Sequence, residues 1–172
     1  MDSGKHSFSI VVEDTAGSCP VGEKWGARNM LEGKIPVISC EGACIRGEIA
    51  RVAANMVGKA EPFRRSCHGE MFTVPDSAIA RWTREAGKVV VIDGCFLHCH
   101  GRVMKNLVAE DRLVLIDALA IYKKYADIFD IEDVPEEDRR NAARQVADKV
   151  ISGLGKGSRK CEAVGCCPGE PA

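Results

Sequence analysis

The fold is decided by KVVVIDGC, residues 88–95, in which an unbroken apolar run ends in Asp-Gly-Cys. A short run of this kind is typical of a strand that is covered on both faces, as in a parallel sheet. A glycine directly after such a strand lets the backbone turn sharply into the next element. The stretch therefore predicts the strand-to-helix junction of an α/β protein.

The segments on both sides repeat this order of strand and then helix. IPVIS at residues 35–39 predicts a strand, residues 62–67 predict a weaker one, and RLVLIDALA at residues 112–120 predicts a fourth. Three helices are expected between these strands: Ile45–Val57 closed by Gly58, a segment begun by Thr73 and Asp76 that carries Ile79, Trp82 and Ala86, and a segment with Phe96, Cys99, Val103 and Leu107 on one face. Two more are expected after the fourth strand. The first is a short helix at residues 121–129, and the second is a longer one capped by Asp133 and Glu136, with Ala142, Val146 and Val150 on one side.

Strands that alternate with helices imply right-handed crossovers and parallel strands. We therefore expect a single three-layer α/β domain with a mainly parallel sheet, Rossmann-like or flavodoxin-like, over residues 35–153. Residues 1–34 form an N-terminal extension, in which SFSIVV at residues 7–12 could add an edge strand. Residues 154–172 are rich in glycine and cysteine and are expected to form a flexible tail.

The composition excludes several classes of protein. The 172 residues carry 24 basic and 25 acidic side chains, a formal net charge of -1, which does not indicate nucleic-acid binding. We see neither a secretory signal nor an apolar run of the roughly 18 residues that a membrane helix needs, and so expect a cytoplasmic protein. In that reducing compartment, nine cysteines indicate metal binding or thiol chemistry rather than disulfides.

Five of the cysteines lie where a predicted strand gives way to a helix: Cys40, Cys44, Cys67, Cys95 and Cys99. The carboxyl ends of parallel strands meet at one edge of a sheet, where α/β proteins bind ligands. Cysteines four apart on a helix face the same way, so we expect Cys95 and Cys99 to present two sulfurs to one point. The pattern predicts a zinc site of thiolates, and an iron–sulfur cluster is the alternative cofactor. The alternative without any bound metal is that these are buried free cysteines, which pack in the core as small apolar residues.

The order of these residues resembles the DGC-domain family, small prokaryotic proteins described as zinc-binding. The resemblance spans about residues 35–118 and depends on VVVIDGC followed by Cys99, on VISCEG before a helix, and on Cys67 between them. It implies that Cys40, Cys67, Cys95 and Cys99 are the metal ligands. Cys44 departs from the usual pattern of the family, so it is a fifth candidate, and the choice of four ligands stays open. The resemblance implies no particular enzymatic activity.

Several other residues are secondary candidates for the site. Asp93 is expected either to orient a metal ligand by accepting a hydrogen bond or to cap the following helix. His98 could replace a sulfur, whereas His68 and His100 adjoin cysteines without being expected to face the metal. The remaining cysteines and histidine are not assigned to the main site: His6, Cys19, and the tail residues Cys161, Cys166 and Cys167, which could hand over metal or hold a second ion.

Two other functions follow from the cysteines, and whether the protein is an enzyme is left open. Cys40 and Arg46 have the C-x5-R spacing of a phosphate-binding loop, which resembles low-molecular-weight tyrosine phosphatases and arsenate reductases. That resemblance implies Cys40 as nucleophile and Arg46 as the anion-binding residue, although Gly47 replaces the usual Ser or Thr. A thiol redox switch, with a bond from Cys40 to Cys44 or from Cys95 to Cys99, is the third hypothesis.

Overall fold

A computed structural model of the chain describes residues 9–155, and its four strands form one sheet. All pairs of neighbouring strands are parallel, and their order is β2-β1-β3-β4. The strands are β1 (Ile35–Ser39), β2 (Phe63–Arg65), β3 (Val89–Asp93) and β4 (Leu113–Asp117). The predicted α/β domain with a parallel sheet is confirmed.

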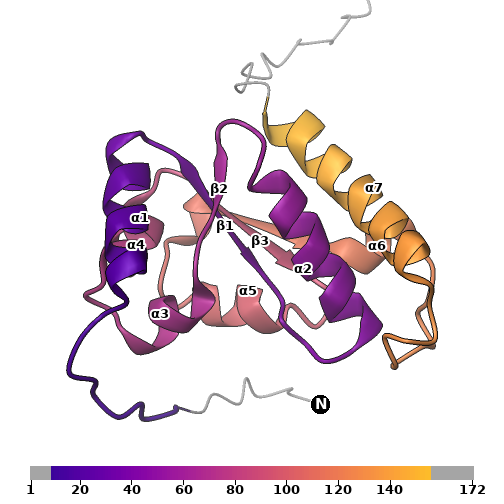
Figure 1. Cartoon of the computed structure of the whole chain (residues 1–172), viewed down its shortest axis with the longest axis horizontal. Helices are drawn as coiled ribbons and strands as arrows, with labels where there is room; N and C mark the ends of the chain where they lie inside the picture. The colour runs from indigo at the N-terminus through magenta and orange to yellow at the C-terminus, as the bar shows by residue number, and fades with distance from the viewer. Residues whose placement is uncertain (1–8, 156–172) are drawn as a thin grey trace, which may run out of the picture.

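Helices cover both faces of this sheet, as Figure 1 shows. On one side lie α2 (Ile45–Val57), α6 (Ala118–Tyr122) and α7 (Glu136–Leu154). On the other side lie α3 (His68–Thr73), α4 (Ala78–Glu85), α5 (Cys99–Met104) and α1 (Pro20–Leu31), which packs against α4; the 3-10 helix η1 (Glu110–Arg112) precedes β4. The molecule therefore has three layers.

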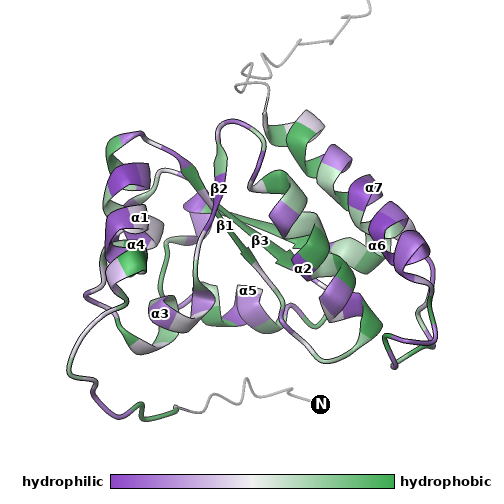
Figure 2. Cartoon of the chain, in the orientation of Figure 1, coloured by the Kyte–Doolittle hydropathy of each residue, from purple (hydrophilic) through white to green (hydrophobic). Residues whose placement is uncertain are grey.

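The central strand β3 is apolar from Val89 to Ile92 because both of its faces are buried. In β3, Val90 and Ile92 pack on the side of α2 and α7. Val89 and Val91 pack on the opposite side, against residues of α3, α4 and α5 such as Met71. Alternate residues of a strand point to opposite faces, so a strand between two helical layers needs an apolar residue at every position. Figure 2 accordingly shows the central strands as hydrophobic, whereas β2, which is Phe-Arg-Arg, and the outer turns of α7 are largely hydrophilic.

The order of the strands places a topological switch point between the ends of β1 and β3. The chain leaves β1 toward α2 on one side of the sheet and leaves β3 toward α5 on the other, although the two strands are neighbours. The connecting segments diverge at this point, which is where α/β sheets of this order bind ligands. Cys40 directly follows β1, and Asp93 is the last residue of β3.

Two predicted boundaries are wrong, and in both cases a polar side chain starts the helix elsewhere. The fourth strand ends at Asp117, because its Oδ1 accepts a hydrogen bond from the N–H of Ala120 (3.2 Å) and thereby caps α6. Helix α4 is capped by Ser77, whose Oγ accepts from the N–H of Ala80 (3.2 Å). Thr73 is instead the last residue of α3.

The segment after β3 also differs from the prediction. Helix α5 begins at Cys99, and Cys95 lies in the turn before it, so these two cysteines do not share a helix face. Phe96, predicted on that face, is exposed. The physical reason is His98, whose left-handed backbone (φ 46°) reverses the chain before the helix can start.

The ends of the described chain differ from the prediction in three ways. Helix α1 was not expected; it begins after Cys19, whose Sγ accepts from the N–H of Gly22 (3.4 Å). Residues 9–12 of the proposed edge strand belong to no strand, and the short helix expected at residues 121–129 is α6, which ends at Tyr122. In the described part of the chain, we find no helix with the length and apolar character to cross a membrane.

Candidate metal centre

Cys40 is held at the carboxyl end of β1 by the neighbouring strand. Its backbone N–H donates to the carbonyl of Ile92 in β3 (2.9 Å), which extends the parallel pairing one residue beyond β1. Its side chain is partly buried, and its Sγ accepts from the N–H of Gly42 (3.4 Å). The sulfur is therefore fixed beside the end of β3.

Asp93 is fixed by the helix that follows it in the chain. Its side chain is only 1 % exposed, and Oδ1 and Oδ2 accept from the N–H groups of His100 (3.0 Å) and Gly101 (2.9 Å). These are amides of the first turn of α5, which have no partner within the helix. A Cβ atom on Gly101 would lie 2.9 Å from Oδ2, so this approach depends on glycine. The interpretation of Asp93 as a helix cap is confirmed.

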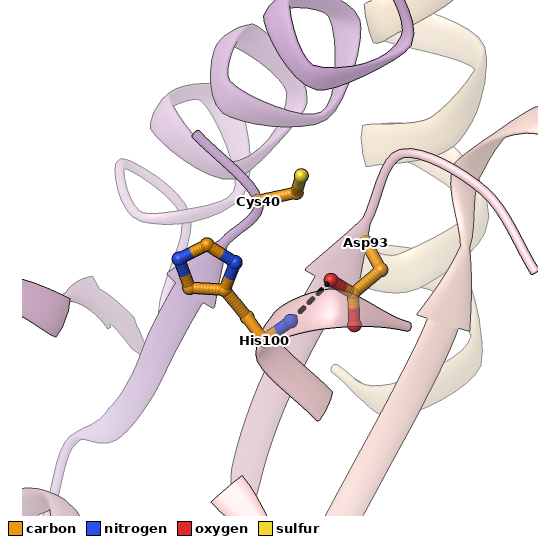
Figure 3. A group of neighbouring side chains, drawn as sticks. All are labelled: Cys40, Asp93 and His100. Atoms are coloured by element: carbon orange, nitrogen blue, oxygen red, sulfur yellow. Dashed lines mark hydrogen bonds between the residues drawn. The ribbon is translucent and has the colours of Figure 1, made fainter. Parts of the chain in front are cut away.

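The structure brings Cys40, Asp93 and His100 into one group of potential metal ligands. The sulfur, a carboxylate oxygen and a ring nitrogen of these residues all lie within 4.8 Å of one another. Figure 3 shows the three side chains coming from three segments: Cys40 from the end of β1, Asp93 from the end of β3 and His100 from the start of α5. Thiolate, imidazole and carboxylate are the three ligand types that zinc accepts in proteins.

The imidazole of His100 has the properties of a metal ligand. Its Nδ1 is buried and has no hydrogen-bond partner within residues 9–155. Burial, followed by the nearby ring of His68, lowers the pKa of His100, while Asp93 acts in the opposite direction. The neutral ring is the form that binds metal ions. The ring of His68 lies edge-on to that of His100 at a centroid distance of 5.0 Å and holds it from the side.

The sulfur of Cys40 lies in an environment that disfavours an isolated thiolate. Burial raises its pKa, the amides of Gly42 and Gly94 oppose this, and the charges of Asp93 and Cys99 add to the increase. Several negative groups that lie close together are stabilised when a cation binds between them. Cys99 is the first residue of α5 and is exposed; it does not belong to the group of Cys40, Asp93 and His100, although its charge contributes to the raised pKa of Cys40.

The other predicted cysteines occupy separate places along the same edge of the sheet. Cys67 is exposed and directly precedes α3, Cys95 is partly buried in the turn after β3, and Cys44 is partly buried before α2. None of them belongs to the group of Cys40, Asp93 and His100. The tail residues Cys161, Cys166 and Cys167 lie outside the described residues, as does His6.

Sequence reasoning placed Asp93 beside the site but missed His100 as a potential ligand. The register of the parallel strands explains why Asp93 lies beside Cys40, since Ser39 pairs with Ile92 and the next residues along are Cys40 and Asp93. Periodicity could not have found His100, because its position depends on the reversed backbone at His98.

The structure thus defines a doubly wound α/β protein with a cysteine-containing candidate metal centre at the carboxyl edge of its sheet. Among protein-family profiles, the DGC domain matches residues 36–151, so the chain belongs to the DGC-domain family. No curated protein and no solved structure matches the chain.

Proposed function

We propose that the protein binds a zinc ion at the carboxyl edge of its sheet and that Cys40, Asp93 and His100 hold the ion. The observation that carries the proposal is the convergence of three different ligand types, from two strand ends and one helix start, within 4.8 Å. The unpaired Nδ1 of His100 supports it, because a buried ring nitrogen without a hydrogen bond is stabilised by a metal ion.

Cys99 is the fourth ligand in this proposal. As the first residue of α5 it is adjacent to His100 in the chain, and its charge acts on the Cys40 thiol, although it lies outside the group of three. A tetrahedral site filled by four protein atoms has no open position for water. The role that follows is structural, or concerned with sensing or handling the metal, rather than catalytic.

The mixed set of ligands favours zinc over the other ions considered. Iron–sulfur clusters are held mostly by cysteine thiolates, and hard cations such as Mg²⁺ prefer oxygen atoms. A set of sulfur, nitrogen and oxygen matches the preferences of zinc. The four-cysteine set implied by the family resemblance, Cys40, Cys67, Cys95 and Cys99, is the alternative. It shares two members with the mixed set, so Cys67 and Cys95 distinguish the two.

The test is the zinc content of the full chain purified without added metal, measured by elemental analysis. We expect about one zinc per chain, as in a single tetrahedral site. Cys40→Ser and His100→Gln should each lose the zinc, whereas Cys19→Ser, which changes a cysteine that caps α1, should retain it. Cys67→Ser and Cys95→Ser should retain it as well if the mixed set is correct.

Circular dichroism of each variant shows whether a loss of zinc reflects the site or a loss of fold. A wild-type protein that contains no zinc, and that unfolds at the same temperature with and without a chelator, would overturn the proposed function.

A further inference from the structure

Helix α1 lies outside residues 36–151, the part of the chain that matches the DGC family, yet side-chain hydrogen bonds hold it on the domain. Oε1 of Glu23 accepts from the backbone N–H of Ala78 at the start of α4 (2.9 Å). The indole Nε1–H of Trp25 donates to the backbone carbonyl of Arg65 at the end of β2 (2.9 Å). The second contact connects α1 to the sheet itself.

The side chain of Arg65 continues this connection toward the carboxyl end of β1. Its Nη1 donates to the backbone carbonyl of Val37 in β1 (3.1 Å), and its Nη2 donates to Oε1 of Glu41 (3.2 Å), the residue after Cys40. Its stem is confined as well, because a Cβ atom on Gly58 would lie 2.7 Å from its Cγ. A guanidinium carries several donors in one fixed plane, so one arginine can hold a carbonyl and a carboxylate together.

Glu41 closes the chain around Cys40. Its Oε1 also accepts from the hydroxyl of Ser39 (2.6 Å), which is fully buried, so the residues on both sides of the cysteine are joined through their side chains. Between them, the backbone N–H of Cys40 donates to the carbonyl of Ile92 (2.9 Å). The backbone is therefore fixed before, at and after the cysteine, which limits the directions in which its side chain can point.

We propose that Glu41 and Arg65 are positioning residues that fix the Cys40 sulfur at the metal centre, and that α1 contributes to metal binding through Trp25. This inference rests on the proposed function, because the metal centre is what the positioning serves. The contacts run from the indole of Trp25 to the backbone of Arg65, from its guanidinium to Glu41, and so to the segment that carries the sulfur. Residues that orient metal ligands from behind typically change metal affinity about 10–100-fold when they are replaced.

A purely structural role for these contacts makes a different prediction. The side chains of Arg65 and Glu41 are 25 % and 27 % exposed, and partly exposed ion pairs contribute little to stability. Their loss should therefore leave the fold intact. If they position Cys40, however, their loss should loosen the chain on both sides of it and weaken zinc binding. Stability and zinc affinity thus separate the two roles.

The test is the zinc affinity of the full chain, measured by competition with a chelating dye, together with urea unfolding of the metal-free protein. Glu41→Ala should weaken zinc binding by at least about tenfold. Glu41→Gln retains an acceptor oxygen and should weaken it less, and Arg65→Lys, with one nitrogen in place of two, should weaken it as well. Glu61→Ala is the matched control, because Glu61 pairs with Lys34 (2.8 Å) before the amino ends of the strands, and it should bind zinc like the wild type.

The two tryptophans provide a second matched pair. Trp25→Phe keeps an aromatic ring but removes the N–H, so it should weaken zinc binding by about 2–10-fold, the effect of one neutral hydrogen bond. Trp82→Phe is the control, because its Nε1–H also donates to a backbone carbonyl, that of Lys34 (3.0 Å), which precedes β1. It should leave the zinc affinity unchanged, although the ring of Trp82 is the more buried of the two.

Amide hydrogen exchange of the metal-free chain shows whether the effect is local. Residues 39–44 should exchange faster in Glu41→Ala and Trp25→Phe than in the wild type, but not in the two controls. A wild type that binds zinc, with these two variants no weaker than their controls, would overturn the inference and leave the proposed function in place. Weaker binding without faster exchange of residues 39–44 would also overturn it. A wild type that binds no zinc would overturn the proposed function and this inference together.

Discussion

Asp93 accepts a hydrogen bond of 3.0 Å from the backbone N–H of His100, while the side chains of the same two residues belong to one group of potential metal ligands. The carboxylate therefore has a structural and a functional role. It fixes the start of α5, and by doing so it places the imidazole of His100 beside Cys40. Changes at Asp93 should affect the fold and the proposed metal site together.

Asp93→Ala should destabilise the protein strongly. Because the carboxylate is buried and accepts from two amides, its removal leaves both N–H groups without a partner. Each unsatisfied buried group costs about 1–3 kcal/mol. The free energy of unfolding, measured in urea, should fall by about 2–6 kcal/mol on this basis.

Asp117→Ala is the matched control for that variant. Asp117 pairs with Asp93 in the register of β3 and β4 and also caps a helix, but through one hydrogen bond to Ala120 at an exposed position. Loss of such a cap costs about 0.5–2 kcal/mol. Equal destabilisation by the two variants would show that the buried environment of Asp93 has no special importance.

Gly94→Ala should also destabilise the protein, because the end of β3 passes very close to the first turn of α2. A Cβ atom on Gly94 would lie 2.7 Å from the carbonyl carbon and oxygen of Arg46, which are backbone atoms that cannot move aside independently. Overpacking of this kind costs about 1–3 kcal/mol. Zinc binding should weaken as well, since the displaced strand end carries Asp93.

The control for this glycine is Gly153→Ala in α7. A Cβ atom on Gly153 meets nothing within 4 Å, and alanine favours a helix by about 0.5–1 kcal/mol over glycine. Thermal unfolding should therefore show opposite shifts for the two variants. A stabilising effect of Gly94→Ala would contradict the close contact between β3 and α2.

The reactivity of Cys44 should depend on Arg46. Arg46→Gln removes a positive charge that lowers the pKa of Cys44, so alkylation of Cys44 by iodoacetamide should reach half its maximal rate at a higher pH. Arg51→Gln is the control, because Arg51 lies on the same helix but pairs with Glu48. Peptide mass spectrometry over a series of pH values measures both midpoints, and equal midpoints in the wild type and Arg46→Gln would contradict the interaction.

The lowered pKa of Cys44 also has a consequence for stability. A group whose pKa is lower in the folded than in the unfolded chain contributes stability above its unfolded value, and that contribution is lost as the pH falls through the folded value. The Cys44→Ser variant lacks the thiol, so its free energy of unfolding should lack this contribution. Urea unfolding curves measured at a series of pH values below about pH 9, the range set by an ordinary thiol pKa, test this.

Much of the fold could be predicted from the sequence because the apolar runs leave few alternatives. IPVIS forms β1 and the helix closed by Gly58 is α2, both as expected. Helix α1 could not be predicted in the same way, since it has only a weak apolar face and contains Gly22 and Gly26. Its glycines are explained by tertiary contacts, since a Cβ atom on Gly26 would lie 2.3 Å from the backbone nitrogen of Ile79 in α4.

The site was only partly predictable. Because the strands are parallel, the sequence correctly placed Cys40 and the end of β3 at one edge. The contribution of His100 follows from a reversal of the backbone at His98 and from two amide hydrogen bonds to Asp93, which depend on the folded chain. The expected four-cysteine ligand set stays a prediction.

X-ray absorption at the zinc edge of the purified protein tests the central claim most directly. A metal centre of Cys40, Cys99, Asp93 and His100 predicts a mixed first shell, with zinc–sulfur distances of about 2.3 Å and zinc–nitrogen or zinc–oxygen distances of about 2.0–2.2 Å. A shell of four sulfur atoms, or a protein that binds no zinc, would contradict it.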